Sequence, residues 1–126
     1  KGELQMSDLP DAWNEGMEKL LGIKPPTDRE GCLQDIHWYD GAWGYFPTYT
    51  LGAMTAAQLF TRAKTEKPEI LESITKGNFK PLMNWLIMNV HSKGCSLSTK
   101  DLITIATGEP LNAKFFKSHL QNRYLN

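Results

Sequence analysis

Apolar residues recur every three or four positions along most of the chain, which is the spacing that places them on one face of an α-helix. The first such stripe starts at Leu9 and leads to Leu21. Gly22 can end a helix in the left-handed conformation, and Pro25 cannot continue one. The pattern therefore predicts a helix that begins at about Pro10 and ends at Leu21.

The longest stripe predicts a helix that begins at Phe46 or Pro47 and ends near Pro68. Small residues lie along this helix, and they would let a neighbouring backbone approach closely: Gly52, Ala53, Ala56 and Ala57.

Shorter stripes predict three further helices that end at Gly77, Gly94 and Gly108, and Asn112 is expected to cap a last one. No pair of segments shows the alternating pattern of paired strands. We therefore expect an all-α fold of five or six helices, organised as a single helical domain over residues 1–126.

The segment between the first two long stripes has no clear period. Residues Pro25 to Glu30 are predicted to form a stiff, extended connector, and Asp40 to Gly44 a glycine-rich turn. Between them, Cys32 to Trp38 is compatible with either a short helical turn or an extended piece, and the pattern leaves both open.

The charge balance narrows the classes of function. Lysines and arginines equal aspartates and glutamates at 14 each, so the chain lacks the basic excess that nucleic-acid binding requires. No apolar run approaches the length of a membrane span. Cys32 and Cys95 form no short metal or redox motif, which favours reduced thiols and a cytoplasmic protein.

Aromatic and polar residues concentrate between Arg29 and Thr50, and buried polar groups are costly unless they are paired. Within this segment His37 follows Asp35 by two positions. An imidazole beside a carboxylate can act as an acid–base group or stabilise an oxyanion. The alternative is a buried histidine that is held by local hydrogen bonds.

Three other side chains of this segment have two interpretations each. Tyr45 and Tyr49 would share one face if the turn between them is helical, where they could donate to an oxyanion or simply pack in the core. Arg29 could hold a substrate carboxylate, although it could equally be a solvated surface residue. The sequence contains no metal-binding motif, because the three histidines are far apart and no His-Glu-x-x-His occurs.

The octapeptide from Gly31 to Trp38 resembles the Gly-x-x-Gln-Asp-x-His-Trp motif of the thermostable (Taq-type) zinc metallocarboxypeptidases. Further segments are similar to the C-terminal part of that family in the same order: residues 7–14, 28–30, 44–52, 56–59 and 107–110. The resemblance covers nearly the whole chain.

This resemblance implies a mainly helical peptidase with a deep groove that releases C-terminal residues from peptides. In that family, zinc is held by the two histidines of a His-Glu-x-x-His helix and a downstream glutamate. This chain contains neither, so we expect no bound zinc and an inactive fragment when it is alone. Its expected partners are the peptide C-terminus, an N-terminal metal-binding portion and a second copy of itself.

The resemblance also implies site residues. The candidates for oxyanion stabilisation are His37, Tyr45 and Tyr49, and those for the substrate-binding wall are Arg29, Gln34, Asp35 and Trp38. Gln34 and Asp35 are expected to orient His37. The alternative function is a non-catalytic helical interaction or dimerisation module.

Overall fold

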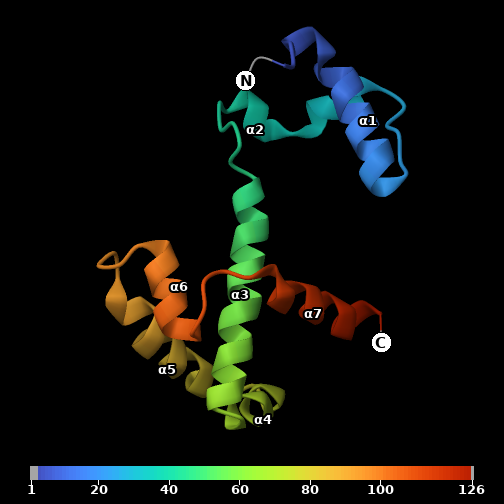
Figure 1. Cartoon of the computed structure of the whole chain (residues 1–126). Helices are drawn as coiled ribbons and strands as arrows, with labels where there is room; N and C mark the ends of the chain where they lie inside the picture. The colour runs from blue at the N-terminus through green and yellow to red at the C-terminus, as the bar shows by residue number, and fades with distance from the viewer. Residues whose placement is uncertain (1–2, 126) are drawn as a thin grey trace. The chain divides into compact units, whose positions relative to one another are not determined.

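The computed structural model describes residues 3–125, and in this range every regular element is a helix (Figure 1). The all-α prediction is therefore confirmed. The chain divides into two compact units, Lys1–Phe46 and Pro47–Asn126, and each is considered by itself. No helix among the described residues is long and apolar enough to cross a membrane.

The first unit contains the helices α1 (Leu9–Leu21) and α2 (Ile36–Tyr39) and three 3-10 turns. These turns are η1 (Met6–Asp8), η2 (Asp28–Glu30) and η3 (Cys32–Gln34). The helix α1 confirms the first predicted helix, and Gly22 closes it at φ 68°, in the left-handed conformation that glycine adopts without strain.

The prediction of an extended connector from Pro25 to Glu30 is wrong at its C-terminal end. Asp28–Glu30 forms η2, in which the backbone N–H of Glu30 donates to the carbonyl of Thr27 at 3.0 Å. The Thr27 hydroxyl also donates to the Glu30 carboxylate at 3.0 Å. This local pair stabilises a turn where the prolines alone predicted an extended chain. Gly41 and Gly44, with φ near 70°, form the predicted turn that follows.

The second unit is built on α3 (Pro47–Glu66), which confirms the predicted long helix. The helices α4 (Glu69–Thr75), α5 (Lys80–Asn89), α6 (Thr99–Thr107) and α7 (Ala113–Tyr124) follow it, with the turn η4 (His91–Lys93) after α5. The described residues thus contain seven α-helices rather than five or six, because the undecided segment before Tyr39 supplies α2.

The fourth predicted helix, which corresponds to α5, does not end at Gly94 as expected. The helix α5 ends at Asn89, and Val90 departs from helical geometry with φ −125°. The chain then makes the separate turn η4 before Gly94. The Asn112 cap agrees with prediction, since its side chain accepts from the backbone of Lys114. The helix α6 is capped in the same way by the Ser98 hydroxyl, which accepts from the backbone of Asp101.

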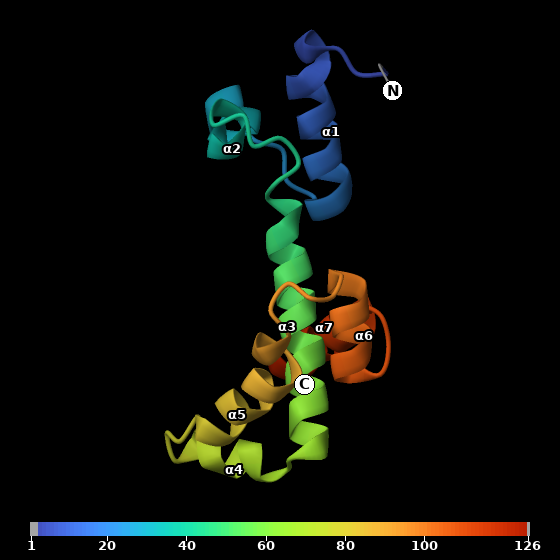
Figure 2. The same ribbon diagram turned by 90° about the vertical axis from the view of Figure 1, so that its left-hand side faces the viewer.

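The core of the second unit lies where α3, α4 and α5 meet, near the C-terminal end of α3 (Figure 2). Ala63, Ile70 and Trp85 are buried there, and five partly buried apolar side chains pack against them. The Trp85 indole N–H donates to Glu66 at 2.6 Å, which satisfies its polar group. The helices α6 and α7 lie on opposite sides of α3, and the loop between them crosses it (Figure 1).

Candidate functional site

The candidate site in the first unit is centred on His37, the second residue of α2. Asp35 precedes this helix, and its carboxylate accepts from the backbone N–H of His37 at 3.0 Å. The same carboxylate oxygen lies 2.5 Å from Nδ1 of the His37 ring. One side chain therefore caps the helix and fixes the orientation of the imidazole.

The Asp35 carboxyl is held in its ionised form. Burial raises the pKa of Asp35, but the hydrogen bonds from the side chain and backbone of His37 outweigh that effect and lower it. The charge of His37 and the nearby indole of Trp38 add smaller lowering effects, although that indole N–H does not meet hydrogen-bond geometry. Asp35 is therefore a hydrogen-bond acceptor for His37 at neutral pH.

Aromatic rings surround the imidazole. The Phe46 ring stacks on it with centroids 5.7 Å apart, and the Tyr45 ring lies 5.6 Å away in a tilted arrangement. The His37 side chain is 24% exposed, so solvent or a ligand can still reach it. Phe46 was not predicted to belong to the site, because its only signal in the sequence is its place beside Tyr45 in the aromatic segment.

Trp38 lies in a cluster of three tryptophans. Its ring contacts Trp43 edge-on at 4.9 Å and Trp13 of α1 at 6.3 Å. The indole N–H groups of Trp13 and Trp38 are buried, and neither has a hydrogen-bond partner among the described residues. The cluster packs the predicted site segment against α1, a contact that no pattern in the sequence indicated.

Gln34 and Arg29 are joined to each other. The side-chain amide of Gln34 donates to the backbone carbonyl of Arg29 at 2.5 Å, which ties η3 back to η2. Both residues are exposed. Of the two side chains expected to orient His37, Asp35 therefore bonds to the ring directly, whereas the amide of Gln34 is directed at η2.

The two candidate tyrosines differ in their setting. The helix α3 begins at Pro47, so Tyr45 precedes it while Tyr49 lies within its first turn. Tyr45 and His37 belong to the first unit, and Tyr49 belongs to the second. The two tyrosines were expected to share one helical face only if the turn between them is helical. Because Tyr45 lies outside α3, they do not share a face of that helix.

The described residues offer no place for a metal ion, since no three histidine, cysteine, aspartate or glutamate side chains come together in residues 3–125. Cys32 is buried and Cys95 is exposed, both as free thiols. The residues of this range therefore do not fit a zinc site by themselves.

Comparison with known proteins identifies the protein family to which this chain is similar. The family described as Carboxypeptidase Taq (M32) metallopeptidase matches residues 1–124. The chain is 44% identical over 124 residues to carboxypeptidase 1 of Bacillus subtilis and 42% identical over 123 residues to thermostable carboxypeptidase 1 of Pyrococcus furiosus.

Solved structures of carboxypeptidases contain a region with the same fold as this chain. The Trypanosoma cruzi metallocarboxypeptidase 1 superposes with a TM-score of 0.93 at 41% identity, covering 99% of this chain and 26% of that one. The Pyrococcus furiosus carboxypeptidase gives a TM-score of 0.92 at 41% identity, covering 98% of this chain and 25% of that one. This chain therefore belongs to the M32 (Taq-type) carboxypeptidase family. It spans about a quarter of the length of the curated relatives it matches.

Proposed function

We propose that this chain forms one wall of the substrate groove in a zinc carboxypeptidase that releases C-terminal amino acids from peptides. Membership of the M32 family supports the reaction class. The single observation that carries the proposed role is the Asp35–His37 pair, in which a carboxylate fixes an imidazole that is still 24% exposed. The zinc would be held by residues outside this chain, since its described residues do not form a metal site.

The proposed role of His37 follows from its hydrogen bonding. When the ring is protonated, Nδ1–H donates to Asp35 and Nε2–H becomes a second donor of fixed direction. Addition of water to a peptide carbonyl places negative charge on its oxygen, and donors aimed at that oxygen stabilise the tetrahedral intermediate. Tyr45, whose ring lies beside the imidazole, supplies a second phenolic donor in this proposal. Tyr49 is the third candidate donor, presented by α3.

The remaining candidates would bind the substrate. The Arg29 guanidinium is proposed to pair with the C-terminal carboxylate of the peptide, a contact that arginine makes with two parallel hydrogen bonds. Gln34 would hold the backbone of Arg29 in place through the hydrogen bond described above. Trp38 would form an apolar part of the wall, supported by Trp13 and Trp43.

The test needs the full-length enzyme that contains this chain. His37→Ala should lower kcat for a peptide substrate by on the order of a hundredfold, as the loss of one oxyanion donor does. The matched control is His91→Ala, which removes an exposed histidine of η4 in the second unit. An unchanged rate for His37→Ala would refute the assignment. Tyr45→Phe and Tyr49→Phe, measured in parallel, identify which phenol takes part.

A second candidate function is self-association of the chain as a helical module. It is favoured by exposed apolar side chains at the end of α1, where Leu20 is 80% and Leu21 is 62% exposed. Light scattering of the 126-residue chain over a range of concentrations tests this candidate, because a mass that stays monomeric excludes it.

A further inference from the structure

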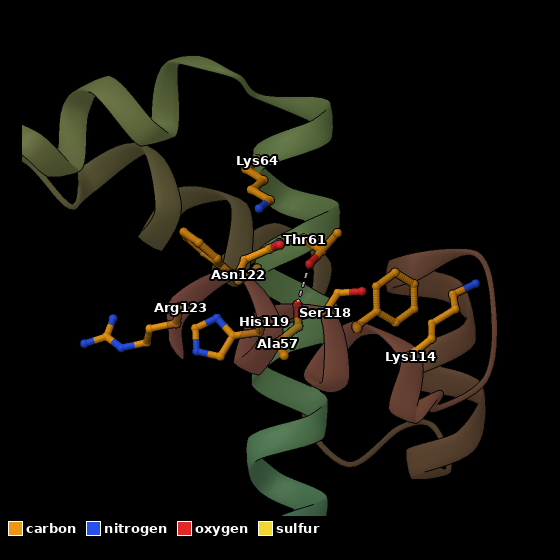
Figure 3. Close-up of a pocket in the computed structure, with 10 residues that line it drawn as sticks. Ala57, Thr61, Lys64, Lys114, Ser118, His119, Asn122 and Arg123 are labelled. Atoms are coloured by element: carbon orange, nitrogen blue, oxygen red, sulfur yellow. Dashed lines mark hydrogen bonds between the residues drawn. The ribbon is translucent and has the colours of Figure 1, made fainter. Parts of the chain in front are cut away.

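The helices α3 and α7 border an open groove of about 550 Å³ in the second unit (Figure 3). Lys64 and Thr61 of α3 face the part of α7 that carries His119 and Asn122 (Figure 3). Arg123 and Lys114 project from the two ends of the groove (Figure 3). A groove of this size exceeds what a single ion or water fills and falls in the range of pockets that bind organic ligands.

Positive charge in the groove is not balanced by the helices that form it. Neither helix contributes a carboxylate to the lining, and the one acidic residue on α3 and α7 is Glu66. Glu66 is already engaged, since it accepts from Trp85 and pairs with Arg62 at 2.7 Å. Among the described residues, the lining of the groove therefore contains lysine, arginine and histidine side chains and no carboxylate.

Three side chains of the groove are positively charged at neutral pH, namely Lys64, Lys114 and Arg123, and they differ in whether a carboxylate pairs with them. Lys114 is paired with Glu109 at 2.7 Å. Lys64 and Arg123, by contrast, have no carboxylate within ion-pair distance among the described residues. These two positive charges are therefore available to an anionic group that enters the groove.

Apolar surface lies between the charges. Phe60 and Phe115 line the groove, and the Lys64 ammonium lies 5.7 Å from the centre of the Phe60 ring. No residue of α7 in the described range is buried, so this helix is only partly covered. A ligand that matches the groove thus combines carboxylates with apolar side chains, which is the composition of an acidic segment of polypeptide.

We propose that an acidic segment of the parent carboxypeptidase, from the part outside these 126 residues, docks in this groove. The inference rests on the proposed function, in which this chain works as one part of a larger enzyme. Relatives that match the chain along 98% of its length are about four times as long, so a parent of that kind has further polypeptide to cover an exposed groove. The docked segment would place carboxylates on Lys64 and Arg123 and apolar side chains on Phe60 and Phe115.

The test compares thermal unfolding of the full-length enzyme with that of the 126-residue chain. The variant Lys64→Glu/Arg123→Glu reverses both unpaired charges in each background. In the full-length enzyme, the Tm should fall by about 2 °C or more, and high salt should shrink the difference. In the 126-residue chain the Tm should fall by clearly less, because only the contacts of Lys64 with Phe60 and of Arg123 with Tyr124 are lost there and no acidic segment loses its partners. The matched control is Lys117→Glu, an exposed lysine of α7 that does not line the groove.

Three results would overturn the proposal. The first is an unchanged Tm of the full-length variant, and the second is an equal fall in both backgrounds. The third is a dimeric mass of the 126-residue chain by light scattering that Lys64→Glu/Arg123→Glu returns to the monomer, which would make a second copy the occupant of the groove. All three results come from measurements of thermal unfolding or of molecular mass. The proposed function is tested by the catalytic rate of His37→Ala, so the docking proposal and the proposed function can fail independently of each other.

Discussion

The side-chain amide of Gln58 on α3 donates to the hydroxyl of Thr107 at the end of α6, with 2.8 Å between nitrogen and oxygen. The same amide nitrogen lies 3.1 Å from the carbonyl of Glu109 and 3.2 Å from that of Pro110. The Gln58 carbonyl oxygen accepts from the backbone of Asn112 at 2.9 Å. Gln58 is fully buried, so the hydrogen bonds of its amide attach the α6–α7 loop to α3 where the loop crosses this helix.

Gln58→Leu should therefore destabilise the second unit strongly. The substitution keeps a similar volume but removes the buried hydrogen bond to Thr107 and leaves the partly buried N–H of Asn112 without its acceptor, for which we expect a loss of about 1–3 kcal/mol in the free energy of unfolding. Urea denaturation followed by circular dichroism measures the change. Gln121→Leu, at an exposed position of α7, is the control and should be nearly neutral. Equal stability of the two variants would contradict the role of the Gln58 network.

Ionised Glu109 should stabilise the folded protein, and this contribution should be lost in acid. The side-chain hydrogen bonds from Lys114 and Asn112 lower the pKa of Glu109 below its ordinary value of 4.5. A carboxyl with a lowered pKa in the folded state stabilises the protein above its unfolded pKa, and this contribution is lost as the pH falls through the folded value.

Glu109→Gln should consequently lower the Tm at pH 7 and have progressively less effect as the pH falls below 4.5. Thermal unfolding at a series of pH values gives this difference. Glu72→Gln serves as the control, because Glu72 pairs with Lys76 four residues later in an exposed setting. If the effect of Glu109→Gln were the same at every pH, its hydrogen bonds would not be the cause.

Trp85 should contribute through its indole nitrogen as well as through its ring. Trp85→Phe keeps an aromatic ring in the core but removes the hydrogen bond to Glu66, which should cost about 1–2 kcal/mol. Chemical denaturation measures it. Trp43→Phe is the matched control, since the Trp43 side chain is 60% exposed, and a cost for Trp85→Phe no larger than the control would contradict the prediction.

Replacing Gly16 or Gly108 with alanine should change the stability of the protein in opposite directions. Gly16 lies within α1 and a Cβ there meets no atom within 4 Å, so Gly16→Ala should stabilise the protein by about 0.5–1 kcal/mol. Gly108 ends α6 at φ 90°, so Gly108→Ala should destabilise it by about 1 kcal/mol. The pair of measurements isolates the backbone conformation, since both changes add the same methyl group to an open site.

The sequence predicted the long elements because their information is local. The helices α1 and α3 each combine an apolar stripe with glycine or proline at an end, so both were predicted within one or two residues. The turn η2 was not predicted, and η3 lies in a segment for which a helical turn and an extended piece were both left open. Three-residue 3-10 turns have no period and depend on individual hydrogen bonds such as Thr27 to Glu30.

In the candidate site, too, local contacts could be predicted from the sequence and contacts between distant residues could not. Asp35 and His37 are two positions apart, so their contact could be anticipated from the sequence. The stacking of Phe46 on His37 and the packing of Trp13 on Trp38 depend on how the chain folds back. The groove between α3 and α7 likewise joins residues of the two helices that lie fifty or more positions apart, and no motif indicated it.

The hydrogen bonds of Gln58 also determine the order in which parts of the second unit can fold during synthesis. Its partners follow it by 49 to 54 positions, and the last of them is Asn112. Domains begin to fold while the chain is still being made. Until Asn112 has left the ribosome, α3 is present but the set of bonds that anchors the loop to it is incomplete. Attachment of the α6–α7 loop to α3 is therefore a late event within this unit, completed only as α7 emerges.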